Sequence, residues 1–321
     1  MSAFDSARPR VLWRDVVLYI VLAYGSAWAL WFALIPHIAR LVTASKTPDK
    51  LSVSALFSLG MFAPLLAAVV MRLFVSKEGL RGSLGPVRKW RYYGVAVLVP
   101  MILVSATIAV DVVLGFGDFT WGAKLPLWLE YVVLALNGLT LSAVFAFGEE
   151  YGWRGYLLPK LLPLGEIKAA VLVGLIWGPW HIPLILAGLN YPGVSPLAAI
   201  GMFMVAAVLM SLLFTRIFVL AGGSVLVAAV LHGSLNAFGD KLMATKHLSG
   251  SPLVVSAAGV VGLAVFAIAV VIAYTRFAGK PRVSGKPRAH GHARPAMSNA
   301  RAIGHGVLSV EALDPAADRK A

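Results

Sequence analysis

The sequence predicts an all-α, polytopic membrane protein with about eight transmembrane helices. Three observations predict this fold class. Hydrophobic residues make up 59% of the 321 residues, whereas charged residues make up only 13%, about half of the share that soluble domains usually carry. The mean hydropathy is +0.83. Long stretches without Asp, Glu, Lys or Arg recur along the chain, so water cannot be the only solvent around this protein.

Eight such stretches are candidate transmembrane helices, because a helix that crosses a bilayer needs roughly 17–25 mainly apolar residues. They cover residues 16–35, 53–71, 94–110, 131–147, 169–189, 197–215, 217–231 and 252–275. The seventh stretch is short, and it extends through Asn236 if His232 and Asn236 face the protein interior. We interpret the first stretch as a retained helix, because no clear small-residue signal-peptidase site follows it.

The basic residues are distributed unevenly about these helices. With the N-terminus in the cytoplasm, 22 of the 28 Lys and Arg residues fall on the cytoplasmic side and 6 on the other side. The positive-inside rule requires such a bias when both termini are cytoplasmic. The net charge of +14 therefore reflects topology and attraction to anionic lipid headgroups. We expect an integral protein of the plasma membrane whose partner is the lipid bilayer, with no nucleic acid partner.

The chain divides into one membrane domain and two tails. Residues 1–15 form a short cytoplasmic tail, residues 15–278 form the membrane domain, and residues 279–321 form a basic, disordered cytoplasmic tail with almost no apolar periodicity. The chain contains no cysteine. This excludes thiol catalysis, disulfide bonds, cysteine-ligated metals and lipidation on cysteine.

A first polar cluster lies at the end of the fourth predicted span. Ionisable side chains at membrane depth cost about 2.5–3.5 kcal/mol each, so by default they mark function or a buried pair. The cluster reads Glu149-Glu150-x-x-x-Arg154. Because residues four apart share a helix face, Glu150 can pair with Arg154 while Glu149 faces another partner. Glu149 could then hold and deprotonate a water molecule; alternatively, all three residues form a structural ion network.

Two further polar clusters lie in the fifth and seventh spans. His181 follows a Gly-Pro pair and precedes Pro183, and such a break is tolerated only where protein or a wet cavity satisfies the backbone. His232 and Asn236 are four residues apart and share one helix face. Alone, His181 could be a packing residue, and the other two could join neighbouring helices. Together with the first cluster they form a hydrolytic set of a base, a polariser and oxyanion donors.

The three clusters resemble the motifs of the CPBP family of membrane proteases, which includes the type 2 CAAX prenyl endopeptidases and the bacteriocin-processing relatives. The family pattern is Glu-Glu-x-x-x-Arg, then an aromatic residue four positions before His, then His-x-x-x-Asn or Asp. All three motifs occur in this order between residues 127 and 238. The second motif more often begins with Phe, so Trp177 is a departure that we expect to affect only packing.

The resemblance implies an intramembrane endopeptidase that hydrolyses peptide bonds of membrane-associated protein or peptide substrates, as in CAAX-type processing. The site residues that it implies are Glu149, Glu150, Arg154, His181, His232 and Asn236. By this resemblance, Glu149 and His181 activate the attacking water, and His232 and Asn236 stabilise the oxyanion. The remaining glutamate and the arginine hold the site in shape.

Some functional alternatives stay open at this point. A transporter or proton-coupled carrier could use the same Glu and His residues as a relay, and a member of the same family could act as a non-catalytic scaffold or immunity protein. For the protease, we expect the site to open toward the cytoplasmic leaflet.

The sequence also leaves the metal open. Glu149, His181 and His232 could supply a His and carboxylate set for zinc with one open position, as the frequent description of the family as metalloproteases implies. In the alternative, Glu149 and His181 hold the water without a metal, and His232 with Asn236 donates to the oxyanion. The compact His-Glu-x-x-His helix of zinc proteases does not occur in the sequence. We favour the metal-free site.

Overall fold

The computed structural model describes residues 10–44, 58–122, 124–188, 191, 193–243 and 247–277, and for residues 37–44 it describes the backbone alone. Within these ranges the regular structure is helical, apart from an isolated β-bridge between Phe119 and Leu248. The all-α fold class is therefore confirmed. The predicted C-terminal tail and most of the predicted N-terminal tail lie outside the described residues.

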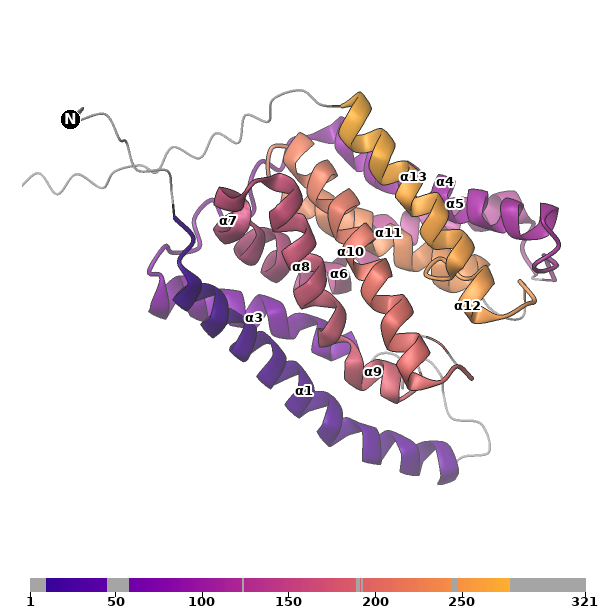
Figure 1. Ribbon diagram of the computed structural model, residues 1–321, viewed down its shortest axis with the longest axis horizontal. Helices are drawn as coiled ribbons and strands as arrows, with labels where there is room; N and C mark the ends of the chain where they lie inside the picture. The colour runs from indigo at the N-terminus through magenta and orange to yellow at the C-terminus, as the bar shows by residue number, and fades with distance from the viewer. Residues whose placement is uncertain are drawn as a thin grey trace, which may run out of the picture. The chain divides into compact units, whose positions relative to one another are not determined.

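The helices follow one another along the chain, and the longest described connections are the segments 76–89 and 114–126 (Figure 1). Short 3-10 or π-helical turns, labelled η, continue several of the α-helices. In chain order the elements are α1 (Trp13–Ala44), η1 (Leu59–Phe62), α3 (Ala63–Val70), η2 (Met71–Val75), α4 (Trp90–Val113), α5 (Leu127–Leu139), α6 (Leu141–Gly152), η3 (Trp153–Leu157), α7 (Leu158–Leu161), η4 (Leu162–Leu164), α8 (Glu166–Trp180), α9 (Ile182–Leu186), α10 (Pro196–Leu220), α11 (Val225–Leu242), α12 (Pro252–Val255) and α13 (Val260–Arg276).

In the described part of the chain, each of the eight predicted stretches overlaps a helix or consecutive helices. In the described part of the chain, five stretches are long and apolar enough to cross a membrane: Trp13–Pro36, Trp90–Val113, Leu127–Leu164, Pro196–Leu220 and Pro252–Arg276. The other three are shorter or more polar. They are Leu59–Val75, α8 with 15 residues, and α11, which carries the third polar motif. The polytopic membrane fold is confirmed, with fewer full-length spans than the eight predicted.

The predicted start of the seventh span is wrong by several residues. α10 continues to Leu220 and α11 begins only at Val225. In the turn between them, Gly222 and Gly223 have φ values of 76° and 87°, a backbone conformation that glycine adopts without steric cost. α11 then runs past Asn236, as expected for a helix whose polar face is turned inward.

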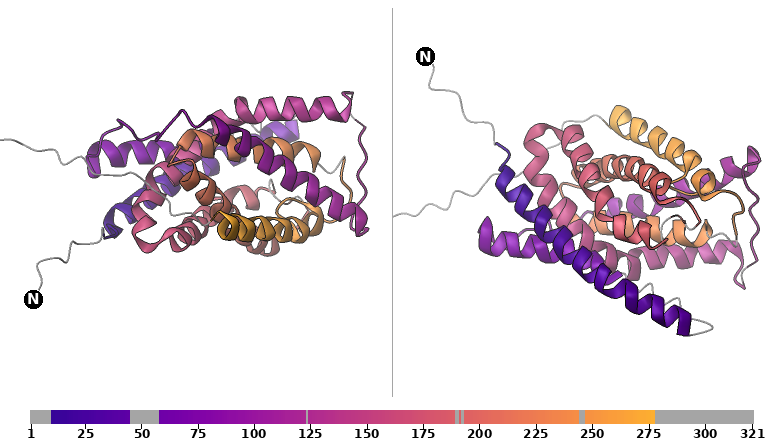
Figure 2. Two further views of the ribbon diagram at one scale, coloured as in Figure 1. Left: turned by 90° about the horizontal axis from the view of Figure 1, so that it is seen from above. Right: turned by 60° about the horizontal axis from the view of Figure 1, so that its bottom comes forward.

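The helix α11 lies in the interior of the bundle (Figures 1 and 2), where it packs against α4, α5, α6 and α10. Most of its side chains are buried. It approaches α6 so closely that a Cβ atom at Gly233 would lie 2.5 Å from the backbone nitrogen of Ala143. This close approach brings the polar motif of α11 next to the polar motif of α6.

Large apolar side chains cover much of the outer surface of the helices. Val21 on α1, Ile102 on α4, Val205 on α10 and Ile268 on α13 are each exposed over more than half of their surface. In water such a surface would favour association, whereas in a bilayer it faces lipid tails. The distribution of exposed apolar residues therefore supports an integral membrane protein.

Candidate active site

The first polar motif lies where α6 passes into the single π-helical turn η3. Glu149 and Glu150 belong to the last turn of α6, and Arg154 belongs to η3. Single π-helical turns within α-helices are frequent at functional sites. The exposed fractions of these residues are 2%, 0% and 0%, so three ionisable side chains meet in the interior of the protein.

Glu150 is the centre of a buried ion network. The Nη1 atom of Arg154 donates to Oε1 of Glu150 at 2.7 Å, and Nδ1 of His232 lies 2.9 Å from the same oxygen. An ionised carboxylate only accepts hydrogen bonds, so Nδ1 of His232 carries a proton. The pairing of Glu150 with Arg154 that helix geometry predicted is therefore present. His232 is a third member of the network, which the sequence did not indicate.

The guanidinium of Arg154 has few other polar contacts. It lies 4.9 Å from the ring centre of Trp177 and 5.0 Å from that of Phe214, an arrangement that favours a cation between aromatic faces. Its Nε and Nη2 atoms have no hydrogen-bond partner among the described residues. Glu150 is therefore the carboxylate that forms an ion pair with Arg154 among the described residues.

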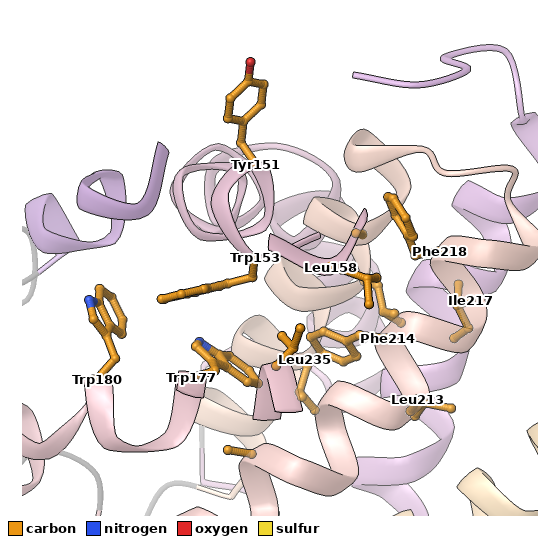
Figure 3. Close-up of a cluster of buried hydrophobic side chains, with 14 of the residues drawn as sticks. Tyr151, Trp153, Leu158, Trp177, Trp180, Leu213, Phe214, Ile217, Phe218 and Leu235 are labelled. Atoms are coloured by element: carbon orange, nitrogen blue, oxygen red, sulfur yellow. The ribbon is translucent and has the colours of Figure 1, made fainter. Parts of the chain in front are cut away.

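Glu149 faces two tryptophan side chains. The indole Nε1–H of Trp177 donates to Oε2 of Glu149 at 2.6 Å, and that of Trp153 donates to the same oxygen at 3.3 Å. Figure 3 shows the rings of Trp153 and Trp177 near that of Trp180, whereas Tyr151 points away from them. Two donors on one oxygen fix the orientation of the carboxylate and leave Oε1 for another partner. The expectation that Trp177 affects only packing is therefore wrong.

His181 lies at the break between α8 and α9. Its Nδ1 atom lies 3.0 Å from the carbonyl oxygen of Trp177. Because a carbonyl oxygen only accepts, Nδ1 carries the proton and Nε2 keeps a lone pair that can accept a hydrogen bond. The ring packs against Phe203, with ring centres 4.6 Å apart. The break thus fixes both the position and the tautomer of this histidine.

A cavity of about 620 Å³ joins these residues, a volume within the usual range for ligand sites. Four of the six predicted site residues line it: Glu149, His181, His232 and Asn236. Glu150 and Arg154 are fully buried behind its wall. Trp177, Phe203, Met210 and Leu235 contribute apolar surface to the same cavity. The fold therefore separates polar groups that can touch a bound molecule from polar groups that hold them.

The geometry does not fit the zinc site that the sequence allows. In the part of the chain that the structure describes, no three His, Asp or Glu side chains are grouped so that they could hold a metal ion. Glu149, His181 and His232 therefore do not form such a group. Oε2 of Glu149 already accepts two N–H donors, and Nδ1 of His232 faces Glu150. We assign no chemical step to a metal.

Comparison with known proteins places the motifs in a protease family. Residues 128–238 match the family described as type II CAAX prenyl endopeptidase Rce1-like. The chain is also 33% identical over 93 residues to CAAX prenyl protease 2 of Methanococcus maripaludis, over 28% of this chain and 32% of that relative. The similarity to this family thus covers the motif region, residues 128–238. This confirms the CPBP resemblance, and the match spans about a third of the relative's length.

Proposed function

We propose that this chain is an intramembrane endopeptidase of the CAAX type, which acts in the cell membrane on membrane-associated proteins or peptides. The observation that carries the proposal is the cavity. It brings together two groups that can hold water, Glu149 and His181, and two groups that can donate to an oxyanion, His232 and Asn236. The family of the motif region supports the same activity and favours neither a carrier nor a scaffold.

In the proposed reaction, Glu149 and His181 hold the attacking water. The indole donors occupy Oε2 of Glu149, so Oε1 takes a proton from the water while the water oxygen bonds to the carbonyl carbon of the substrate. Nε2 of His181 accepts a hydrogen bond from the same water, because its Nδ1–H is held by a backbone carbonyl. A well-placed general base contributes about 10²–10⁴-fold to the rate.

The negative charge that develops on the carbonyl oxygen is stabilised by α11. His232 and Asn236 are one turn apart on the cavity side of this helix. Oε1 of Glu150 accepts from Nδ1–H of His232, and the negative charge of this carboxylate stabilises the doubly protonated imidazolium ring. Only in that form does His232 also carry an Nε2–H that can donate to the oxyanion. Each such donor contributes about 2.7–4 kcal/mol to the stabilisation of the transition state. When the tetrahedral intermediate collapses, the C–N bond breaks and Glu149 returns its proton to the leaving amine.

A comparison of membrane proteomes tests this proposal. Cells that express the wild type, Glu149→Gln or the control Glu78→Gln are compared at matched protein levels. Glu78 lies in a partly exposed ion network with Arg72 and Lys160, away from the cavity-lining residues. We expect new termini in membrane-proximal peptides with the wild type and the control, and their loss with Glu149→Gln. The same peptides in all three strains would contradict an endopeptidase that depends on Glu149.

A further inference from the structure

Helix α1 lies outside the part of the chain that matches the protease family, yet it contacts the region of the site. The family similarity begins at residue 128, whereas α1 spans Trp13–Ala44 and packs against α8 and α9 (Figure 1). The break between α8 and α9 holds His181. The contacts of α1 therefore bear on one of the two groups that hold the attacking water in the proposed reaction.

The break leaves the carbonyl group of Trp180 without its helical partner. In a continuous helix this oxygen would accept a hydrogen bond from the N–H of Leu184. That N–H instead donates to the carbonyl oxygen of His181 at 2.9 Å, and Pro183 has no N–H to offer. Trp180 is fully buried, and a buried carbonyl without a donor costs free energy. The backbone beside His181 thus requires a donor from another part of the chain.

Helix α1 supplies this donor. The indole Nε1–H of Trp28 donates to the carbonyl oxygen of Trp180 at 3.0 Å. One turn earlier on the same face of α1, the hydroxyl of Tyr24 donates to the carbonyl oxygen of Ile176. The ring of Trp31 packs against that of Trp180, with ring centres 4.6 Å apart. Two hydrogen bonds and a ring contact therefore join α1 to the last turn of α8.

The position of the His181 ring depends on the same turn of α8. Its Nδ1–H is held by the carbonyl oxygen of Trp177 at 3.0 Å, and its backbone directly follows the carbonyl group of Trp180. A shift of this turn would move the imidazole relative to Glu149. A misplacement of about 1 Å that arises away from the chemistry can lower a rate by about 10²-fold.

We propose that α1 is part of the catalytic unit, and that Trp28 is a positioning residue which holds the carbonyl oxygen of Trp180 and thereby fixes His181 toward the attacking water. This inference rests on the proposed endopeptidase function for the role of His181, and on the hydrogen bonds alone for the contact of α1 with the break. Trp28 is not among the described residues that line the cavity, so it acts through His181 and touches no substrate.

Hydrogen exchange of the full chain in detergent micelles, read by mass spectrometry, tests the contact of α1 without any assay of activity. Trp28→Phe keeps an aromatic ring and removes the donor. Trp128→Phe is the matched control, because the ring of Trp128 is 69% exposed on α5. If Trp28→Phe does not fold, Tyr24→Phe removes the second donor and carries the same expectation.

The N–H groups of residues 184, 185 and 187 form hydrogen bonds at and after the break, so the peptide that covers residues 182–187 reports its opening. We expect this peptide to exchange about tenfold faster in Trp28→Phe than in the wild type or the control. Unchanged exchange would overturn the proposal. Equal acceleration in the peptide that covers residues 232–240 of α11 would overturn it as well, because the effect would then be general destabilisation.

Cleavage kinetics on the same preparations test the positioning role. The kcat of Trp28→Phe should fall by about 10–100-fold while KM changes by less than about twofold, because His181 holds the water and not the peptide. The control should keep the kcat of the wild type. In a His181→Ala background, Trp28→Phe should cause no further loss, because the two residues act through one group.

An equal further loss in the His181→Ala background would overturn the positioning role, and where that background shows no measurable cleavage, an effect of Trp28→Phe confined to KM would overturn it. Faster exchange with the kcat of the wild type would also overturn it. An absence of cleavage by the wild type would count against the endopeptidase function, whereas the exchange result would still decide whether α1 holds the break.

Discussion

Removal of the Glu150 carboxylate should destabilise the bundle more than any change at Glu149. Oε1 of Glu150 accepts from Arg154 at 2.7 Å and lies 2.9 Å from Nδ1 of His232. Arg154 is fully buried, and two of its nitrogen atoms have no other partner among the described residues. Glu150→Ala therefore leaves a buried guanidinium without ionic compensation. We expect a loss of about 3–5 kcal/mol in the free energy of unfolding, as for other broken buried ion pairs.

Glu149→Gln is the matched comparison, because its amide oxygen can still accept from Trp177 and Trp153. The change removes only the charge-assisted part of these hydrogen bonds, so we expect a loss below about 1.5 kcal/mol. Cleavage should nevertheless fall by about 10²–10⁴-fold, because an amide cannot act as the general base. Stability and activity thus separate at two neighbouring glutamates.

The assay is reversible unfolding in mixed detergent micelles, with cleavage measured on the same preparations. A third variant, Glu150→Ala with Arg154→Met, removes the stranded charge together with its partner. It should recover most of the stability lost in Glu150→Ala, since replacement of both members of a buried pair is often nearly neutral. Equal losses in Glu149→Gln and Glu150→Ala, or no recovery in the double variant, would refute the assignment of the network to Glu150.

Three further outcomes follow from individual contacts. Trp177→Phe should lower kcat/KM about tenfold, because it removes one hydrogen-bond donor to Glu149. Trp180→Phe changes an equally buried indole and should not lower kcat/KM to this extent. Equal losses in the two variants would contradict a positioning role for Trp177. Gly233→Ala should lower the unfolding free energy by about 1–3 kcal/mol, because the added methyl group overpacks against α6. At Gly94 a methyl group meets open space, so Gly94→Ala should raise the unfolding free energy by up to about 1 kcal/mol. Thermal melts that rank the two variants in the other order would refute the overpacking argument. Chelators should leave cleavage unchanged, and stoichiometric zinc in the active enzyme, measured by mass spectrometry, would overturn the metal-free site.

The helices could be predicted because runs without charge are a direct consequence of burial in lipid. Their boundaries could be predicted less well where two apolar helices adjoin. Residues 217–220 have the composition of a span, and only the pair Gly222-Gly223 indicates that the chain turns after them. The break between α5 and α6 was also missed. There Thr140 has φ −121° and ψ −98°, and its hydroxyl donates to the carbonyl oxygen of Leu136 at 2.7 Å.

The contacts within one helix turn could be predicted, and those between helices could not. The pairing of Glu150 with Arg154 follows from their spacing. The contact of Glu150 with His232 joins residues 82 positions apart and depends on the close packing of α6 on α11. The role of the indoles had a partial signal in the sequence, because Trp153 follows Glu149 by four residues and so lies on its face of the helix.

The side from which a substrate enters is a separate property of the site. Glu149 and His232 lie within their helices, so their positions in the sequence favour neither end. His181 does carry information about access, because it directly follows the last residue of α8, a helix that begins at Glu166. It therefore lies at the far end of α8 from Glu166, and the prolines on either side of it open the backbone there. A motif therefore shows which residues meet, whereas the direction of the helix that carries it shows from where they can be reached.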